Sequence, residues 1–186
     1  MTDVTRYVPA PDGRETIVFF SGDTNDIISV IQKIDRLCCN RRAMRKMAVL
    51  LRGANDLETC KNVWRWCVDN LEYKADKNHE KVKASNWLVY NKIGDCKSFS
   101  ILIVDLLREL GYKCFFRFVA YDKTDSTPTH VFPICKAKNG ELIVLDAVPF
   151  DQYGTRKFNV ESDYTFYRDI NSANLYTEGV GKIYHV

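Results

Sequence analysis

A single run of apolar residues in helical spacing constrains this 186-residue chain more than any other feature. Apolar side chains recur at the spacing of one buried helix face, at Phe99, Leu102, Ile103, Leu106, Leu107 and Leu110. Asp95 precedes the run and is a good N-cap, because its carboxylate can accept hydrogen bonds from the unpaired amides of the first turn. Gly111 follows the run and suits a helix end. The pattern predicts a central helix that begins at Cys96.

The position of Cys96 favours a reactive thiolate. In the first turn of a helix, unpaired backbone N–H groups and the positive end of the helix dipole stabilise negative charge on the sulfur. The chain has seven cysteines, and most free cysteines are small buried hydrophobic residues, so position alone does not identify a nucleophile. A working cysteine nucleophile also needs a nearby base, and a histidine is the natural candidate.

Of the three histidines, His130 is the best candidate for that base. His79 lies in a polar run typical of a solvated loop, and His185 is the penultimate residue, where chain ends are often loose. His130 instead opens the apolar, β-like segment Thr129–Cys135, so we expect its backbone to be anchored in a sheet. An anchored imidazole keeps a defined position, as a general base must.

Asn139 and Gly140 predict a tight turn between two antiparallel strands. With these two residues as the whole turn, Asp146 falls opposite Pro133 and about three positions from His130 on the neighbouring strand. A bulge near Pro133, which lacks an amide N–H, or a longer turn would be needed to bring Asp146 and His130 together. If they meet, Asp146 would accept from one ring nitrogen and direct the other toward the cysteine.

Several motifs follow one another in a recognisable order. They are Gly94-Asp95-Cys96 opening the apolar helix, Arg108-Glu109-Leu110-Gly111 at its end, His130 starting a strand and Leu145-Asp146 closing the next. Upstream, Val63–Tyr73 reads as a helix followed by an extended segment. This order resembles the transglutaminase-like superfamily of papain-type cysteine enzymes, and especially its short members encoded in phage and prophage genomes. The resemblance covers about Asp56 to Pro149; Leu142–Val144 stand where the family usually has a tryptophan.

The resemblance implies an α+β fold of the papain/transglutaminase-like type, with a helical N-terminal part and a central cysteine-bearing helix packed on an antiparallel sheet. It implies a catalytic triad of Cys96, His130 and Asp146. The implied activity is acyl transfer from an amide or ester through a thioester, as in a cysteine peptidase, an amidase or a transglutaminase-like acyltransferase. The implied substrate is a protein or peptide, with phage virion proteins and peptidoglycan peptides as candidates.

Attack by a thiolate on a carbonyl creates an oxyanion, which needs hydrogen-bond donors. The backbone N–H of Cys96 at the helix start is one candidate. For a second donor the sequence offers the side chains of Trp87, Asn91, Trp64 and Trp66, and it does not choose among them. It also leaves open whether water or an amine takes the acyl group, which would give hydrolysis or cross-linking.

The length fits one domain of residues 1–186, with a helical N-terminal part at 1–55, a catalytic core at 56–149 and an aromatic-rich C-terminal extension at 150–186. Apolar spacing predicts a helix over Ile27–Leu37 in the N-terminal part. The C-terminal extension is interpreted as an irregular cover over the sheet, with substrate binding or self-blocking as the alternative.

Net charge and cysteine spacing restrict the kinds of binding partner and the cellular compartment that we expect. The net charge is +3, and the basic run Arg41–Lys46 is interpreted as the solvated face of a helix, so nucleic acid is not expected as a partner. The cysteines lack metal-site spacing, and neither a metal nor a cofactor is expected. No signal core or membrane span is visible, so a cytoplasmic protein with reduced thiols is predicted, with virion association as an alternative.

A second class of function stays open at this point. A transglutaminase-like module could serve a phage or prophage in binding or assembly without turnover, because a fold can persist after its chemistry is lost. The presence of Cys96, His130 and Asp146 in the expected order favours the enzyme.

Overall fold

The computed structural model has the α+β architecture that the sequence predicts. It describes residues 4–11, 16–19, 26, 29, 31, 41–76, 80–121, 124, 127–148, 157–160 and 164–171. The helices are the 3-10 helix η1 (Val4–Tyr7), α2 (Arg41–Leu51), α3 (Asp56–Asn70), α4 (Ser85–Asn91) and α5 (Cys96–Glu109). The strands are β1 (Thr16–Phe19), β2 (Glu72–Tyr73), β3 (Glu80–Lys83), β4 (Ile93–Gly94), β5 (Lys113–Ala120), β6 (His130–Lys136), β7 (Leu142–Val144) and β8 (Phe166–Asn171).

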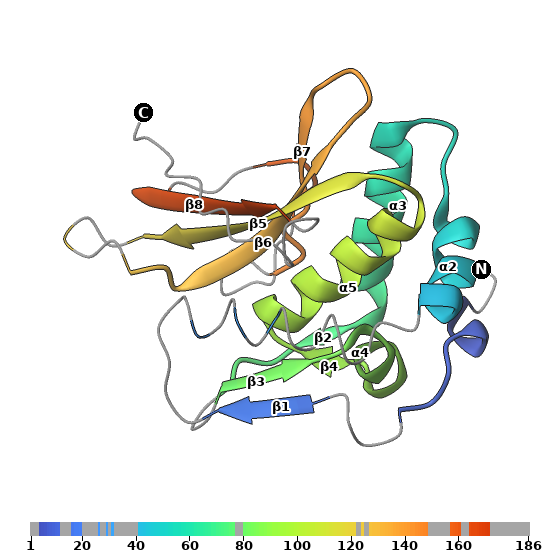
Figure 1. Ribbon diagram of the computed structural model, residues 1–186, viewed down its shortest axis with the longest axis horizontal. Coiled ribbons are helices and arrows are strands. Elements are labelled where there is room, and N and C mark those ends of the chain that lie inside the picture. Colours follow the sequence, from blue (N-terminus) through green and yellow to red (C-terminus); the bar gives the residue numbers. More distant parts are fainter. Residues whose placement is uncertain are drawn as a thin grey trace.

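A four-stranded antiparallel sheet forms one layer of the fold (Figure 1). Its strand order is β7-β6-β5-β8. Within it, Phe116 of β5 lies opposite Pro133 of β6 on one side and Ile170 of β8 on the other. One face of the sheet packs against α5, and the opposite face carries a smaller apolar cluster that includes Val119 and Phe132. The sheet is therefore apolar on both faces in its middle.

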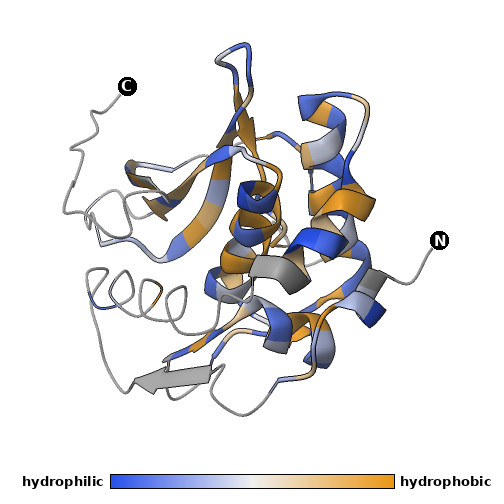
Figure 2. Ribbon diagram, turned by 45° about the vertical axis from the view of Figure 1, so that its right-hand side comes forward, coloured by the Kyte–Doolittle hydropathy of each residue, from blue (hydrophilic) through white to orange (hydrophobic). Residues whose placement is uncertain are grey.

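Helix α5 is the centre of the fold, as its apolar pattern predicts. It contacts α2, α3 and α4 as well as strands β5 and β6 (Figure 1). Every side chain from Lys97 to Leu107 is buried. Figure 2 shows hydrophobic residues concentrated on this helix and on the sheet strands, whereas the turn between β6 and β7 is hydrophilic. Because neighbours enclose α5 on all sides, its first residue is fixed relative to the sheet.

Two short strand pairs flank the start of α5. β1 pairs antiparallel with β3, and β2 pairs parallel with β4 so that Tyr73 lies opposite Gly94. The β2 strand continues from α3, which agrees with the helix and extended segment expected at Val63–Tyr73. The sequence pattern predicted neither β4 nor α4, because such short elements span too few residues to show a period.

The C-terminal extension corrects one expectation. It is not simply an irregular cover, since Phe166–Asn171 forms β8, which pairs with β5. The buried guanidinium of Arg117 in β5 makes two contacts of 2.7 Å with the carboxylate of Asp169 in β8. A buried charge requires such a partner, so the polar residues that interrupt the apolar pattern of β8 also hold it in place. The remainder of the extension, apart from residues 157–160 and 164–165, lies outside the described residues.

The N-terminal part is described in pieces. The helix predicted over Ile27–Leu37 lies outside the described residues except for Ser29 and Ile31, which are both helical; Ser29 is exposed and Ile31 is buried. In α2, Met44 and Met47 are buried while Arg45 and Lys46 are exposed, as expected of a helix with one solvated face. None of the described helices combines the length and the apolar character needed to cross a membrane.

Candidate active site

Asp95 fixes the first turn of α5 and thereby the position of Cys96. Its carboxylate accepts hydrogen bonds from the Ser98 backbone N–H at 3.0 Å and from the Ser98 hydroxyl at 2.9 Å, which confirms the predicted N-cap. Cys96 follows as the first helical residue. Among the cysteines that the structure describes, Cys96 alone is not buried. The helix start thus presents a partly accessible thiol.

Gly94 is required by close packing in front of α5. A Cβ atom at this position would lie 2.6 Å from Leu88 Cδ1 and 3.1 Å from Ser98 Cβ. Leu88 is itself fully buried in α4, so it has little room to move away. A side chain at residue 94 would therefore push β4 away from the helix start. Close packing therefore explains why the Gly94-Asp95-Cys96 motif has glycine at its first position.

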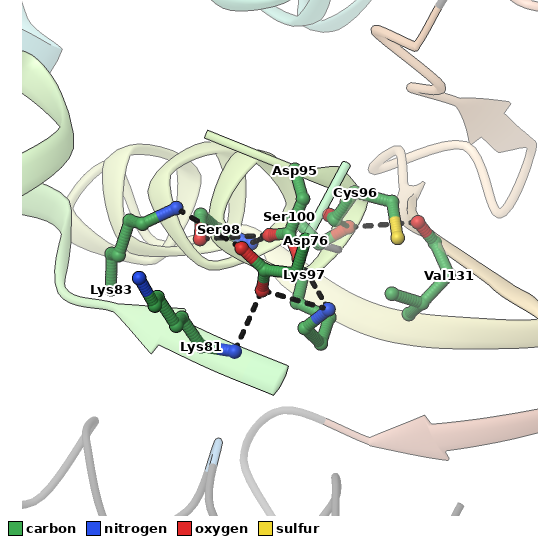
Figure 3. A network of polar contacts seen from close by, with 9 residues as sticks. All are labelled: Asp76, Lys81, Lys83, Asp95, Cys96, Lys97, Ser98, Ser100 and Val131. Carbon is green, nitrogen blue, oxygen red and sulfur yellow. Dashed lines mark hydrogen bonds and ion pairs between the residues drawn. The ribbon is translucent and has the colours of Figure 1, made fainter. Parts of the chain in front are cut away.

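A buried network of acids and lysines supports the helix start (Figure 3). Lys97 forms a short ion pair with Asp95, and its Nζ lies 3.8 Å from Asp76. The Nζ of Lys83, on β3, lies 3.9 Å from Asp76 Oδ1. The oxygen near Lys97, Asp76 Oδ2, also accepts from the Lys81 N–H at 2.7 Å. Burial raises the pKa of Asp76 above its ordinary value. Two carboxylates and two ammonium groups compensate one another here, and they tie β3 and the segment after β2 to α5.

Ser100 links the first turn of α5 to strand β6. Its hydroxyl oxygen lies 2.7 Å from the carbonyl oxygen of Cys96 and 3.1 Å from that of Val131 (Figure 3). Both carbonyl oxygens are acceptors, so the hydroxyl donates between them. Because Val131 directly follows His130, this contact holds the backbones of the candidate nucleophile and the candidate base at a fixed separation.

The turn between β6 and β7 contains three residues, so the expected two-residue turn is wrong. The Ala137 N–H donates to the Glu141 carbonyl at 2.8 Å, and the Gly140 N–H donates to the Ala137 carbonyl at 2.9 Å. Lys138 and Asn139 complete the loop, and Gly140 has a φ of +92°. A three-residue hairpin loop commonly ends on a residue with positive φ, and glycine adopts that conformation without strain.

The longer turn moves Asp146 onto the face of the sheet that carries His130. The Leu145 N–H donates to the Pro133 carbonyl at 3.0 Å, so Asp146 comes opposite Phe132. Alternate residues of a strand share a face, so Phe132 and His130 lie on the same side. A slip of one residue exchanges the two faces, and the register counted from a two-residue turn would have turned Asp146 away.

His130 and Asp146 form a direct pair. His130 Nε2 lies 2.7 Å from Asp146 Oδ2, and Asp146 Oδ1 accepts from the Val148 N–H at 3.0 Å. The indole N–H of Trp64 donates to the backbone carbonyl of Asp146 at 2.7 Å. Asp146 is 3 % exposed. The acid is held on three sides, and Nδ1 of His130 is the ring nitrogen left to interact with Cys96.

His130 is positively charged throughout the neutral pH range. Burial by itself would lower its pKa. Hydrogen bonds with Asp146 and Cys96, and the negative charge of both partners, outweigh burial and raise the pKa of His130 to about 10. An imidazolium hydrogen-bonded to the sulfur is the arrangement that stabilises a cysteine thiolate. The surroundings of His130 therefore favour its charged form beside Cys96.

Two of the predicted oxyanion donors form hydrogen bonds within the protein instead. The indole N–H of Trp64 is directed to Asp146, and the side-chain amide of Asn91 donates to the Trp87 carbonyl at 2.9 Å. Trp64 therefore supports the acid of the site rather than facing an oxyanion. Trp66 is buried in α3, and Trp87 is half-buried in α4. For these last two indoles an oxyanion role stays a prediction.

Two tyrosines that the sequence pattern did not single out border the site. Tyr121 stacks on the His130 ring, with centroids 6.3 Å apart and planes inclined by 27°. Tyr73 is half-buried beside Gly94. Tyr73 could have been noticed, because it ends the segment that resembles the family. Nothing in the local sequence distinguishes Tyr121 from other exposed aromatic residues.

Comparisons with known proteins identify a family and several similar proteins. A family model described as the transglutaminase-like superfamily matches residues 46–147, a span that contains Cys96, His130 and Asp146. A UPF0252 protein from Pyrococcus furiosus is 32 % identical over 107 residues, which are 56 % of this chain. The chain spans 31 % of the length of that relative.

Three solved structures match parts of this chain. A candidate protease from Parabacteroides distasonis superposes with a TM-score of 0.56 at 10 % identity, over 81 % of this chain and 30 % of its own. A candidate cysteine protease from Cytophaga hutchinsonii gives 0.49 at 20 % identity, over 59 % and 38 % of the two chains. LapG from Legionella pneumophila gives 0.47 at 13 % identity, over 82 % and 86 %. At 10 % identity, the likeness to the Parabacteroides distasonis structure concerns the fold alone.

Proposed function

This chain belongs to the transglutaminase-like superfamily, and on that basis we propose that it is a thiol acyl-transfer enzyme acting on peptide or isopeptide amides. In this proposal Cys96 is the nucleophile, His130 the general acid and base, and Asp146 the group that orients the imidazole. The observation that carries the proposal is the 2.7 Å contact between His130 Nε2 and Asp146 Oδ2, beside a cysteine that begins a helix.

The reaction follows from these positions. The Cys96 thiolate attacks the carbonyl carbon, and the new oxyanion receives a hydrogen bond from the backbone N–H at the helix start. The His130 imidazolium then protonates the departing amine, which leaves an acyl thioester on Cys96 and a neutral imidazole. The imidazole removes a proton from the second nucleophile as this attacks the thioester. Release of the acyl product restores the thiolate–imidazolium pair.

Hydrolysis is the proposed outcome, with water as the second nucleophile. Cys96 is partly exposed, and the side chain of His130 is 12 % exposed, so water can reach the thioester. Cross-linking requires an amine to compete with water, which is harder at an accessible site. We propose residues 56–149 as the catalytic core within one domain of 1–186. Phage virion proteins and peptidoglycan peptides are the first substrates to screen, since a phage or prophage origin is itself part of the proposal.

Cysteine alkylation tests the nucleophile without knowledge of the substrate. The native protein is treated with limiting iodoacetamide between about pH 5 and pH 9, and the labelled cysteines are identified by peptide mapping. Cys96 is expected to react fastest and to stay reactive below about pH 7, because the imidazolium holds the sulfur as a thiolate. In His130→Ala, Cys96 should lose its reactivity below about pH 7.

The outcome that contradicts the proposal is a Cys96 that stays unlabelled while the buried cysteines react. A Cys96 that labels at the same rate in the wild type and in His130→Ala below about pH 7 would equally contradict it, since the imidazolium would then have no influence on the sulfur. Such a result would favour a module that binds or assembles without turnover. Peptide mapping keeps labels on Cys38 and Cys39, which lie outside the described residues, separate from those on Cys96.

A further inference from the structure

Tyr73 is fixed next to the residues that lead into Cys96. Strand β2 runs parallel to β4, with Tyr73 opposite Gly94. The Glu72 N–H donates to the Lys92 carbonyl and the Lys74 N–H donates to the Gly94 carbonyl, each at 2.8 Å. Backbone hydrogen bonds on both sides of Tyr73 therefore set its position relative to the start of α5.

The ring of Tyr73 lies along the face of α5 that carries Cys96. It meets the ring of Phe99 edge-on, with centroids 6.1 Å apart and planes inclined by 84°. Phe99 follows Cys96 by three positions, and residues with this spacing are neighbours on one helix face. Tyr73 and Cys96 both pack, partly buried, against the same core cluster. The phenol is thus beside the candidate nucleophile.

The hydroxyl of Tyr73 is a donor held in its protonated form. Burial, followed by the negative charges of Cys96 and Asp95, raises the pKa of Tyr73 to about 12, and Asp146 contributes in the same direction. The carboxylates that cap the helix and orient the histidine thus both act on this hydroxyl. Among the residues that the structure describes, none accepts a hydrogen bond from it. Within the described part of the chain, the Tyr73 hydroxyl is therefore a protonated donor for which no acceptor is recorded.

We propose that the Tyr73 hydroxyl is the second donor to the oxyanion, acting together with the backbone N–H of Cys96. This proposal rests on the proposed function of Cys96. Thiolate attack moves an electron pair onto the carbonyl oxygen, and the hydroxyl and the N–H each donate a hydrogen bond to it. When the amine leaves, the carbonyl re-forms and the Tyr73 proton stays on its own oxygen. Trp64 and Asn91, two of the four donors that the sequence offers, are engaged with backbone carbonyls.

The test compares two reactions of Cys96 in Tyr73→Phe, which keeps the ring and its contact with Phe99. Alkylation by iodoacetamide is a displacement at a saturated carbon and forms no oxyanion. Acylation by 4-nitrophenyl acetate forms an oxyanion, and its rate is read from the release of 4-nitrophenol. Acylation is expected to fall by about 10²- to 10³-fold while alkylation stays within about threefold of wild type.

Tyr112→Phe is the matched control. It removes a half-buried hydroxyl that donates to Asp56 Oδ1 at 3.0 Å near the other end of α5, and it should leave both reactions unchanged. Thermal unfolding of each variant establishes that the fold is kept.

Three outcomes would overturn the proposal. Acylation of Tyr73→Phe within about threefold of wild type shows that the hydroxyl does not stabilise the oxyanion. Equal losses in both reactions show that Tyr73 instead positions the thiolate. A wild-type protein that neither acylates nor alkylates preferentially at Cys96 removes the proposed function itself. This third failure is seen without any variant, so it is distinguishable from a failure of Tyr73 alone.

Discussion

Two groups of thiols in this protein lie in opposite surroundings. Cys96 begins a helix, is partly exposed and faces His130. Cys60 of α3, Cys114 of β5 and Cys135 of β6 are fully buried and form what we term the buried thiol cluster. Within this cluster Cys114 lies directly opposite Cys135 in the sheet. Among the described residues, the thiol group therefore occurs once as a candidate nucleophile and four times as core packing, because Cys67 of α3 is also fully buried.

The difference shows what makes a cysteine reactive. In the buried thiol cluster, hydrogen bonds to Cys135 and then burial raise the pKa of Cys60 and Cys114. These sulfurs are fully buried, so reagents in solution do not reach them in the folded protein. No group of three or more His, Cys, Asp or Glu side chains among the described residues is arranged to hold a metal ion. At Cys96, in the proposed function, a helix terminus and an imidazolium stabilise the thiolate where solvent reaches it.

The largest expected effect separates the two groups directly. Cys96→Ala removes the nucleophile and should lower acylation by 4-nitrophenyl acetate by at least about 10³-fold. Cys114→Ala removes a thiol that is 0 % exposed and should leave acylation within about twofold of wild type. Release of 4-nitrophenol measures both. Comparable losses in the two variants would mean that the buried thiol cluster takes part in the chemistry.

The next largest effect on acylation is expected from loss of the negative charge of Asp146, which acts on Cys96 through His130. Asp146→Asn should reduce acylation by about 10-fold, less than the loss of about 10²- to 10⁴-fold expected for His130→Ala. The amide still accepts a hydrogen bond from His130 but no longer supplies negative charge. The pKa of His130 should fall, so the alkaline limb of the pH–rate profile should move to lower pH in Asp146→Asn. A profile with an unchanged alkaline limb would contradict this role for Asp146.

Helix α5 could be predicted from the sequence because all of its signals are local. The apolar period, the Asp95 cap and Gly111 lie within one continuous segment, and the structure begins and ends the helix within one residue of the expected positions. The contact between His130 and Asp146 could not be predicted, because the strand register cannot be counted without knowing the length of the turn. Asn139-Gly140 is compatible with a two-residue or a three-residue turn, and only the longer turn puts both side chains on one face.

The remaining site features depend on contacts between distant segments. Tyr73 reaches the site through parallel pairing of two strands of two residues each, which leave no periodic pattern. In β8, Asp169 has a low propensity for a strand. Its carboxylate is compensated by Arg117, which lies opposite it in β5 but far away in the sequence. Such partners compensate one another only in the folded chain, so propensity and period do not reveal them.

A smaller effect is expected on stability. The folded-state pKa of His130, about 10, lies above the ordinary value of 6.5, so its protonated form stabilises the fold. This contribution is fully present below the ordinary pKa and is lost as the pH rises through about 10. Wild type should be more stable than His130→Gln near neutral pH by about 1–3 kcal/mol, and the difference should shrink toward pH 10. Urea unfolding at several pH values measures it; a difference that grows with pH would contradict the assignment.

The smallest expected effect concerns the buried thiol cluster itself. Cys135→Ala removes a fully buried sulfur and its hydrogen bonds to Cys60 and Cys114, which should cost about 1–2 kcal/mol in the free energy of unfolding. The rate of Cys96 alkylation should not change, because the cluster does not touch the charge pair that holds that thiolate. Cys135→Ser is the matched control, since its hydroxyl keeps a donor and an acceptor at the same place. Slower alkylation of Cys96 in Cys135→Ala, but not in Cys135→Ser, would mean that the two thiol environments are coupled through β6, the strand that carries both His130 and Cys135.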